Sequence, residues 1–560
     1  MKKFFCRVSA TIMLAFLFFS CTPQTPLILY PTTIDLEVGK EVDLSAFAGR
    51  NAFLIVTNNN DEITKVFNSN SSNINTIDTK FDKDSKAFTS DSKNKITNIP
   101  FEAPKIDIQP VIDNSISDGR SLNATESTVT YEIGDQRSIY GATNNNSQVL
   151  YGNNATLKVI GDHCYVWYLE KSGITVTDAQ LEKLANTFDS IYEKETYLFG
   201  NNYDSNCNYS NLINLKTEQK VHLFVYDLYN DYVEYQNSGT FGYFWAYDFY
   251  KNGTYGSNTT SNSNECQCLH LDSYFTQVVE DYMVSTVAHE FQHLLHYVNK
   301  TIKHASSTDS DSFRYADTWF DEMMSMVCED IMQSQLGIDD DASPKSRLST
   351  FNNSYMYGFT AWLEDDYVFI SYANAYAFGA YLVRNFGIDF IKELAQNDYI
   401  NQEAITRALQ AKNCSLTTFD QAYENFYNTV IFPIGTSYTL FRTARESYKI
   451  GNKTVTFECS PINLFDYPAI TAQNMTSSTA RKYFNGVENT DYYGPVILNA
   501  QYYYSNLYPH GMSVSYWGQI GSNILPSKYT LSSSFATANS GVKYRLYIAY
   551  WWGKKWKNFC

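Results

Sequence analysis

Apolar positions change their spacing along the chain, and this change predicts how the chain is organised. In the central part they recur at helical intervals, most clearly over residues 276–298, where Val, Ala, Phe and Leu form one stripe. The same spacing predicts further helices at residues 316–332, 373–386, 387–396, 401–411 and 416–428. Short apolar runs at 221–227 and 268–272 indicate strands. Helices and strands within one segment predict an α+β fold.

Both ends of the chain show short alternating runs separated by turn residues, which is typical of β-rich structure. Between the N-terminal runs and the central part, the chain is rich in Ser, Thr, Asn and Asp, so it has little to bury. The predicted division is a tether and short β-rich segment at 21–56, a polar linker or propeptide-like region at 57–154, an α+β domain at 155–432 and a β-sandwich-like domain at 433–560.

Composition and charge narrow the class of protein. The 560 residues include 59 acidic and 42 basic side chains, so the formal charge is −17. Nucleic-acid binding needs clustered Lys and Arg, and we therefore expect no nucleic-acid partner. After residue 25 no stretch approaches the roughly 20 apolar residues of a membrane-spanning helix.

The first 20 residues predict a signal peptide of the lipoprotein type. Lys2 and Lys3 precede an apolar run, and Ser20 stands before Cys21, the residue that would receive the lipid. We therefore expect an exported protein of the bacterial cell envelope, anchored to the membrane or cell surface through Cys21. Ordinary signal cleavage near Cys21 is the alternative.

The cysteines beyond position 21 are scattered and contain no CxxC pair. Cys266 and Cys268 lie two residues apart and would point the same way in a strand, so we expect no disulfide between them. Most of these cysteines are expected to be free and buried.

One motif carries chemistry. His289-Glu290-Phe291-Gln292-His293 is an HExxH sequence within the predicted helix 276–298. Residues i and i+4 share one helix face, so His289 and His293 can ligate one metal ion, for which zinc is suited. Glu290 is then close enough to take a proton from a metal-bound water. The alternative is two His on a solvated helix face.

The third ligand decides the subclass. A metzincin needs Gly at 296 and His at 299, where this chain has His296 and Asn299, so that class is excluded. We expect His296 to pack beside the site, although ligation by it stays open. Glu322, on the next predicted helix, has the position of the Glu ligand in zinc peptidases that take their third ligand from a second helix.

HEFQHLLHY followed by WFDEMMSMVCED resembles the hyicolysin family of neutral zinc metallopeptidases, and the resemblance extends over roughly residues 155–430. It implies a zincin-like, gluzincin-like metallopeptidase domain at 155–432 with β-rich domains on both sides. It also implies that His289, His293 and Glu322 are zinc ligands and Glu290 the catalytic base. The chain departs from the family at Met323, where Gly is common, and at Cys328, where a small residue is common.

Similar enzymes use a Tyr or His on a later helix to stabilise the oxyanion. Tyr372 is our first candidate for this role and Tyr376 the second, and both residues could instead only pack. Structural Ca²⁺ stays an alternative cofactor, although the sequence contains no EF-hand loop.

The expected function is a zinc-dependent endopeptidase that acts on proteins or peptides. A surface adhesin that retains a peptidase-like domain is the alternative, and it would bind its partner without needing Glu290. A carbohydrate-active enzyme would need a carboxylate pair at a defined separation, and no pair in the sequence stands out.

Overall fold

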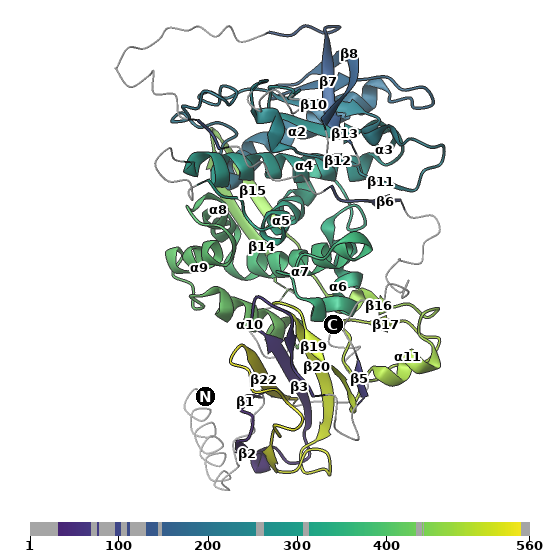
Figure 1. The fold of residues 1–560 in the computed structure, drawn as a ribbon, viewed down its shortest axis with the longest axis vertical. Helices are drawn as coiled ribbons and strands as arrows, with labels where there is room; N and C mark the ends of the chain where they lie inside the picture. Colours follow the sequence, from purple (N-terminus) through teal and green to yellow (C-terminus); the bar gives the residue numbers. More distant parts are fainter. Residues whose placement is uncertain are drawn as a thin grey trace, which may run out of the picture.

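The computed structural model describes residues 32–68, 75–77, 96–101, 109–111, 130–143, 148–253, 262–305, 313–432, 440 and 442–549. Along its longest axis, one sheet with its covering helices lies at one end, a group of helices lies in the middle, and a second sheet lies at the other end (Figure 1). This arrangement confirms a mixed α and β fold.

The first sheet has six strands in the order β12-β13-β10-β9-β8-β7. Its three central strands, β9, β10 and β13, run parallel, and β12 pairs antiparallel with β13 at the edge. The predicted strands at 221–227 and 268–272 are confirmed as β10 and β13. The six bounds are β7 Gln136–Ala142, β8 Gln148–Ile160, β9 Cys164–Tyr168, β10 Val221–Tyr226, β12 Gly242–Tyr243 and β13 Cys268–Asp272.

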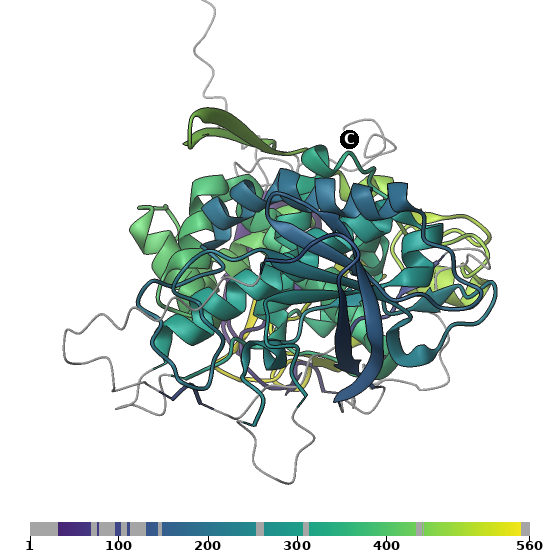
Figure 2. The same cartoon turned by 90° about the horizontal axis from the view of Figure 1, so that it is seen from above.

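Helices α2 and α4 lie against one face of this sheet (Figure 2). Apolar side chains of β9, β10 and β13 share one core with those of the two helices. Thr177 is the N-cap of helix α2 and forms a capping box with Gln180. The predicted helices are confirmed within a few residues. The bounds are α2 Asp178–Phe199, α3 Ser273–Val278, α4 Glu280–His296, α5 Thr318–Leu336, α6 Leu348–Ser354, α7 Val368–Phe386, α8 Ile388–Gln396, α9 Asn401–Ala411, α10 Phe419–Val430 and α11 Ser477–Lys482.

The helix predicted at 276–298 is divided into two. Val279, with φ −139° and ψ 61°, leaves the helical conformation, so α3 ends at Val278 and α4 begins at Glu280. A π-helical turn over Tyr297–Thr301 continues α4. Local periodicity does not report a single residue whose backbone turns away, because the apolar stripe continues on both sides.

The second sheet joins the two ends of the described chain. Its order is β1-β22-β3-β20, and all neighbours are antiparallel. These strands are β1 Thr32–Leu36, β3 Asn51–Asn58, β20 Met512–Gln519 and β22 Val542–Ile548. Shorter pairs are β2 Glu41–Asp43 with β21 Lys528–Thr530, β4 Thr64–Lys65 with β19 Asn506–Leu507, β5 Asn75–Ile77 with β18 Tyr502–Tyr504, β6 Thr97–Asn98 with β11 Ser238–Gly239, β14 Ala444–Ile450 with β15 Lys453–Cys459, and β16 Pro468–Ile470 with β17 Tyr492–Tyr493.

Parts of the predicted polar region 57–154 are packed. Val66 and Phe67 are fully buried, and β7 belongs to the six-stranded sheet. The domain boundaries given above stay predictions. The signal peptide and Cys21 lie outside the described residues. In the part of the chain that is described, no helix is both long and apolar enough to cross a membrane.

Candidate active site

Helix α4 presents the two His side chains of the HExxH motif toward α5. Its buried apolar stripe, which includes Val287, Phe291 and Leu294, packs into the main core. This packing fixes the rotation of α4 about its axis. His289 and His293, one turn apart, are therefore held on the face that looks toward α5.

Three side chains from two helices converge on one point. Nε2 of His289 lies 3.0 Å from Nε2 of His293 and 3.1 Å from Oε2 of Glu322 on α5. Nε2 of His293 lies 3.6 Å from the same carboxylate oxygen. These three side chains, the active-site trio of His289, His293 and Glu322, could thus hold a metal ion together.

Side chains of α5 also contact the Nδ1 atoms of both imidazole rings. Nδ1 of His289 lies 2.8 Å from Oε1 of Glu329. Nδ1 of His293 lies 3.1 Å from Oδ1 of Asp321 and 3.2 Å from Oγ of Ser325. Carboxylates at Nδ1 favour a proton there, so the two facing Nε2 atoms are the nitrogens that would bind a metal ion.

This donor set fits a divalent cation. Two facing nitrogen lone pairs need a proton or a cation between them. Four carboxylates, from Glu290, Asp321, Glu322 and Glu329, surround the two imidazoles, so the pocket carries excess negative charge. Two imidazoles and a carboxylate are the donors that zinc takes in catalytic sites.

The opposite charges in this pocket also shift the pKa values of Glu322 and His289. Burial opposes ionisation of Glu322, but the neighbouring charges and hydrogen bonds of His293 and His289 outweigh burial and hold its pKa well below the usual range. Burial acts against a charged His289, yet its bonds to Glu322 and Glu329 raise its pKa to about 10. The pocket therefore attracts positive charge strongly.

Glu290 lies beside the converging side chains and is not one of them. Its Oε2 accepts a hydrogen bond of 2.9 Å from the backbone N–H of Phe244, the residue that follows edge strand β12. Burial raises the pKa of Glu290, while the charges of His289 and His293 oppose that rise. A carboxylate with a raised pKa is a better proton acceptor at neutral pH.

The two candidate tyrosines on α7 have different neighbours. The Tyr372 hydroxyl donates to Oε1 of Glu322 at 2.7 Å, whereas the Tyr376 hydroxyl donates to Oδ2 of Asp330 at 3.1 Å. Burial and the charge of Glu322 raise the pKa of Tyr372 well above its usual value, so its hydroxyl keeps its proton. Tyr372 thus reaches the trio, and Tyr376 does not.

His296 stands behind the trio. Its Nδ1 lies 3.4 Å from Oδ1 of Asp321, and its ring packs edge-on against Phe320. It is absent from the group that could hold a metal ion. Cys328 is fully buried on α5.

Our sequence reasoning did not identify Asp321, Glu329 or Phe244 as parts of the site. Glu329 follows Glu322 by seven residues and therefore lies on the same face of α5, a spacing that could have indicated it. The contact of Phe244 cannot be recognised from residue types, because it uses the backbone N–H.

Comparison with known proteins agrees with this geometry. The sequence model of the peptidase M30 family matches residues 152–442 of the 560, which include α4, α5 and α7. The chain is also similar to neutral metalloprotease ShpI of Staphylococcus hyicus, at 26% identity over 383 residues, which cover 65% of this chain and 76% of the relative.

Proposed function

The chain belongs to the peptidase M30 family and is a metallopeptidase, and from this premise we propose that it is a zinc-dependent endopeptidase with a zincin-like catalytic domain. The observation that carries the proposal is the convergence of His289, His293 and Glu322, with Glu290 beside them. His289, His293 and Glu322 would hold the metal, as the resemblance to hyicolysins predicts.

The metal and the protein would contribute different steps of peptide-bond hydrolysis. When bound, zinc supplies Lewis-acid polarisation of the scissile carbonyl and makes water more acidic. Glu290 is the general base in this proposal. Because the Phe244 N–H binds Oε2, Glu290 can use Oε1 to take the proton of the attacking water and then deliver it to the leaving amine.

Edge strand β12 supports a way to bind substrate. It is the outermost strand of its sheet among the described residues, and Phe244 follows it directly. An extended peptide that adds to this edge through main-chain hydrogen bonds would run past Glu290. Tyr372, whose proton is retained, stays the predicted oxyanion donor. Its single hydroxyl proton would then turn from Oε1 of Glu322 toward the oxyanion.

The site of action follows from the N-terminal sequence. We propose export, with attachment to the cell envelope through lipid on Cys21, and β-rich flanking domains on both sides of the catalytic domain. The comparisons do not favour the adhesin alternative, because both name peptidases.

Metal removal tests the proposal. The purified full chain should cleave casein, lose this activity with a chelator and regain it with Zn²⁺. Replacing both His289 and His293 with Ala should remove one equivalent of zinc and the activity, whereas His304→Ala should remove neither, since its ring lies near Asp398 instead. A double variant that keeps its zinc and its activity would exclude this site.

Glu329 offers a second test, because it contacts a proposed ligand without joining the trio. Glu329→Gln should weaken zinc binding by a factor of about 10–100, since the carboxylate that orients His289 is lost. Competition with a chromophoric chelator measures this affinity. Glu403→Gln is the control, because this half-exposed side chain on α9 pairs with Arg407, and it should leave the affinity unchanged. Equal affinities for all three proteins would contradict the orienting role.

A further inference from the structure

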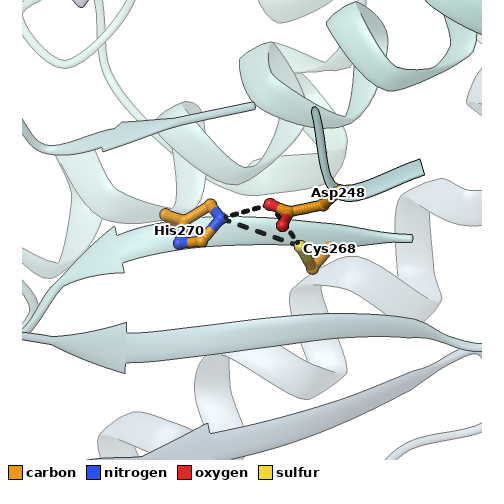
Figure 3. A group of neighbouring side chains, drawn as sticks. All are labelled: Asp248, Cys268 and His270. Atoms are coloured by element: carbon orange, nitrogen blue, oxygen red, sulfur yellow. Dashed lines mark hydrogen bonds and ion pairs between the residues drawn. The ribbon is translucent and has the colours of Figure 1, made fainter. Parts of the chain in front are cut away.

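A second group of metal-binding side chains lies on the opposite face of the six-stranded sheet. Cys268 and His270 are two residues apart on β13 and point the same way, away from the helices. Asp248, on the 3₁₀ helix η5 (Ala246–Phe249), approaches them from the segment that follows β12 (Figure 3). Exposure of Asp248, Cys268 and His270 is 1%, 1% and 0%.

The donor atoms are spaced as ligands of one ion. Nε2 of His270 lies 2.9 Å from Oδ2 of Asp248, and Sγ of Cys268 lies 3.2 Å from that oxygen and 3.7 Å from Nε2 (Figure 3). Nitrogen, oxygen and sulfur ligands of a tetrahedral zinc ion are separated by about 3.3–3.5 Å. The trio of the active site shows the same range, from 3.0 to 3.6 Å.

Neighbouring groups hold two of these ligands in place. Oδ1 of Asp248 accepts hydrogen bonds of 2.8 Å from both the backbone N–H and the side-chain amide of Asn264, which turns Oδ2 toward the other two donors. Nδ1 of His270 lies 3.0 Å from the Tyr226 hydroxyl, which in turn lies 2.9 Å from the hydroxyl of Tyr243. A partner at Nδ1 is what orients a ligating imidazole.

Charge also favours an ion at this group. With the Cys268 thiol and Asp248 ionised, the three donors carry two negative charges at a fully buried position. A divalent ion neutralises them, so the occupied site has no net charge. Cys266 is buried two residues before Cys268 but is not one of the converging side chains.

We propose that Asp248, Cys268 and His270 form a second, structural zinc site. Thiolate, imidazole and carboxylate select zinc over calcium or magnesium. Complete burial leaves no room for substrate, so the ion has no catalytic role. It ties η5 to β13 and thereby fixes the segment that carries Phe244, the backbone partner of Glu290.

Zinc content and cobalt spectroscopy test this site separately from the active site. The purified full chain should hold two zinc ions, and Cys268→Ser should hold one. Replacing zinc with Co²⁺ should give thiolate-to-cobalt charge-transfer absorption in the wild type and in the His289→Ala, His293→Ala double variant. The active-site trio contains no sulfur, so of the two groups of described residues that could hold a metal ion, the buried one alone offers a thiolate.

Cys164→Ser is the matched control, because Cys164 is equally buried on β9 of the same sheet, and its thiol donates to the carbonyl of Ala185 rather than to the metal-binding group. It should keep both zinc ions and the cobalt absorption. The site is excluded if the wild type holds one zinc ion and gives no thiolate absorption, or if mass spectrometry finds Cys266 and Cys268 joined as a disulfide. Since the double variant leaves the buried site intact, its cobalt spectrum decides the question even if Cys268→Ser fails to fold.

Discussion

Glu290→Gln should lower kcat/KM for a protein substrate by a factor of about 10²–10⁴, the contribution typical of a general base. Gln has the same shape, and its amide oxygen can still accept from the Phe244 N–H. It cannot take a proton from the attacking water. Because Glu290 is not among the three converging side chains, zinc content should not change.

Initial rates of casein cleavage and zinc analysis on the same samples give both measurements. Glu280→Gln is the control, since it lies on the same helix, is 42% exposed and contacts Lys183 rather than the site. It should change the rate by less than about twofold, as surface substitutions do. If Glu290→Gln keeps its activity within tenfold of the wild type, another group must be the base.

The geometry of α4 could be predicted closely from the sequence. Its apolar stripe fixes which face is buried, and two His one turn apart must then share the other face. Glu322 was identified from the layout of zinc peptidases whose third ligand is a Glu on a second helix, and then from the resemblance to hyicolysins, because no periodicity in α5 distinguishes one acidic residue from the next. The structure brings it within 3.1 Å of His289.

The partners of the His ligands could not be predicted in the same way. Whether Asp321 and Glu329 reach Nδ1 atoms depends on how α5 is rotated and shifted against α4. That arrangement is set by the core between them, which belongs to the tertiary fold. The contact between Glu290 and Phe244 has the same origin, since it joins a helix to the end of a sheet edge.

The pairing of strands that are distant in the chain could not be predicted from the sequence either. Alternating patterns indicated strands at both ends, but nothing in them shows that Leu54 of β3 lies opposite Leu546 of β22. The cysteines illustrate a related limit. The prediction that most are free and buried is confirmed for those in the described residues, yet the approach of Asp248 to Cys268 depends on the path of the chain between β12 and β13.

A buried ion pair ties the helix of Glu322 to the helix of Tyr372. Arg384 on α7 contacts both carboxylate oxygens of Asp330 on α5, at 2.6 and 3.1 Å, and both side chains are 0% exposed. Tyr376 donates to the same carboxylate. Asp330→Ala should therefore lower the free energy of unfolding by roughly 3–5 kcal/mol, because it leaves a buried guanidinium without its counter-charge.

Calorimetry should show this as a fall in melting temperature on the order of 10 °C. Glu403→Ala is the control, since it breaks an exposed pair with Arg407 whose side chains are 50% and 48% exposed, and should cost at most about 0.5 kcal/mol. Replacing Asp330 with Leu and Arg384 with Met together should recover most of the loss, because no charge then stays buried. If Asp330→Ala melts as the control does, water or another group must neutralise Arg384. The registration of α5 against α7, and with it the contact between Tyr372 and Glu322, must then come from apolar packing alone.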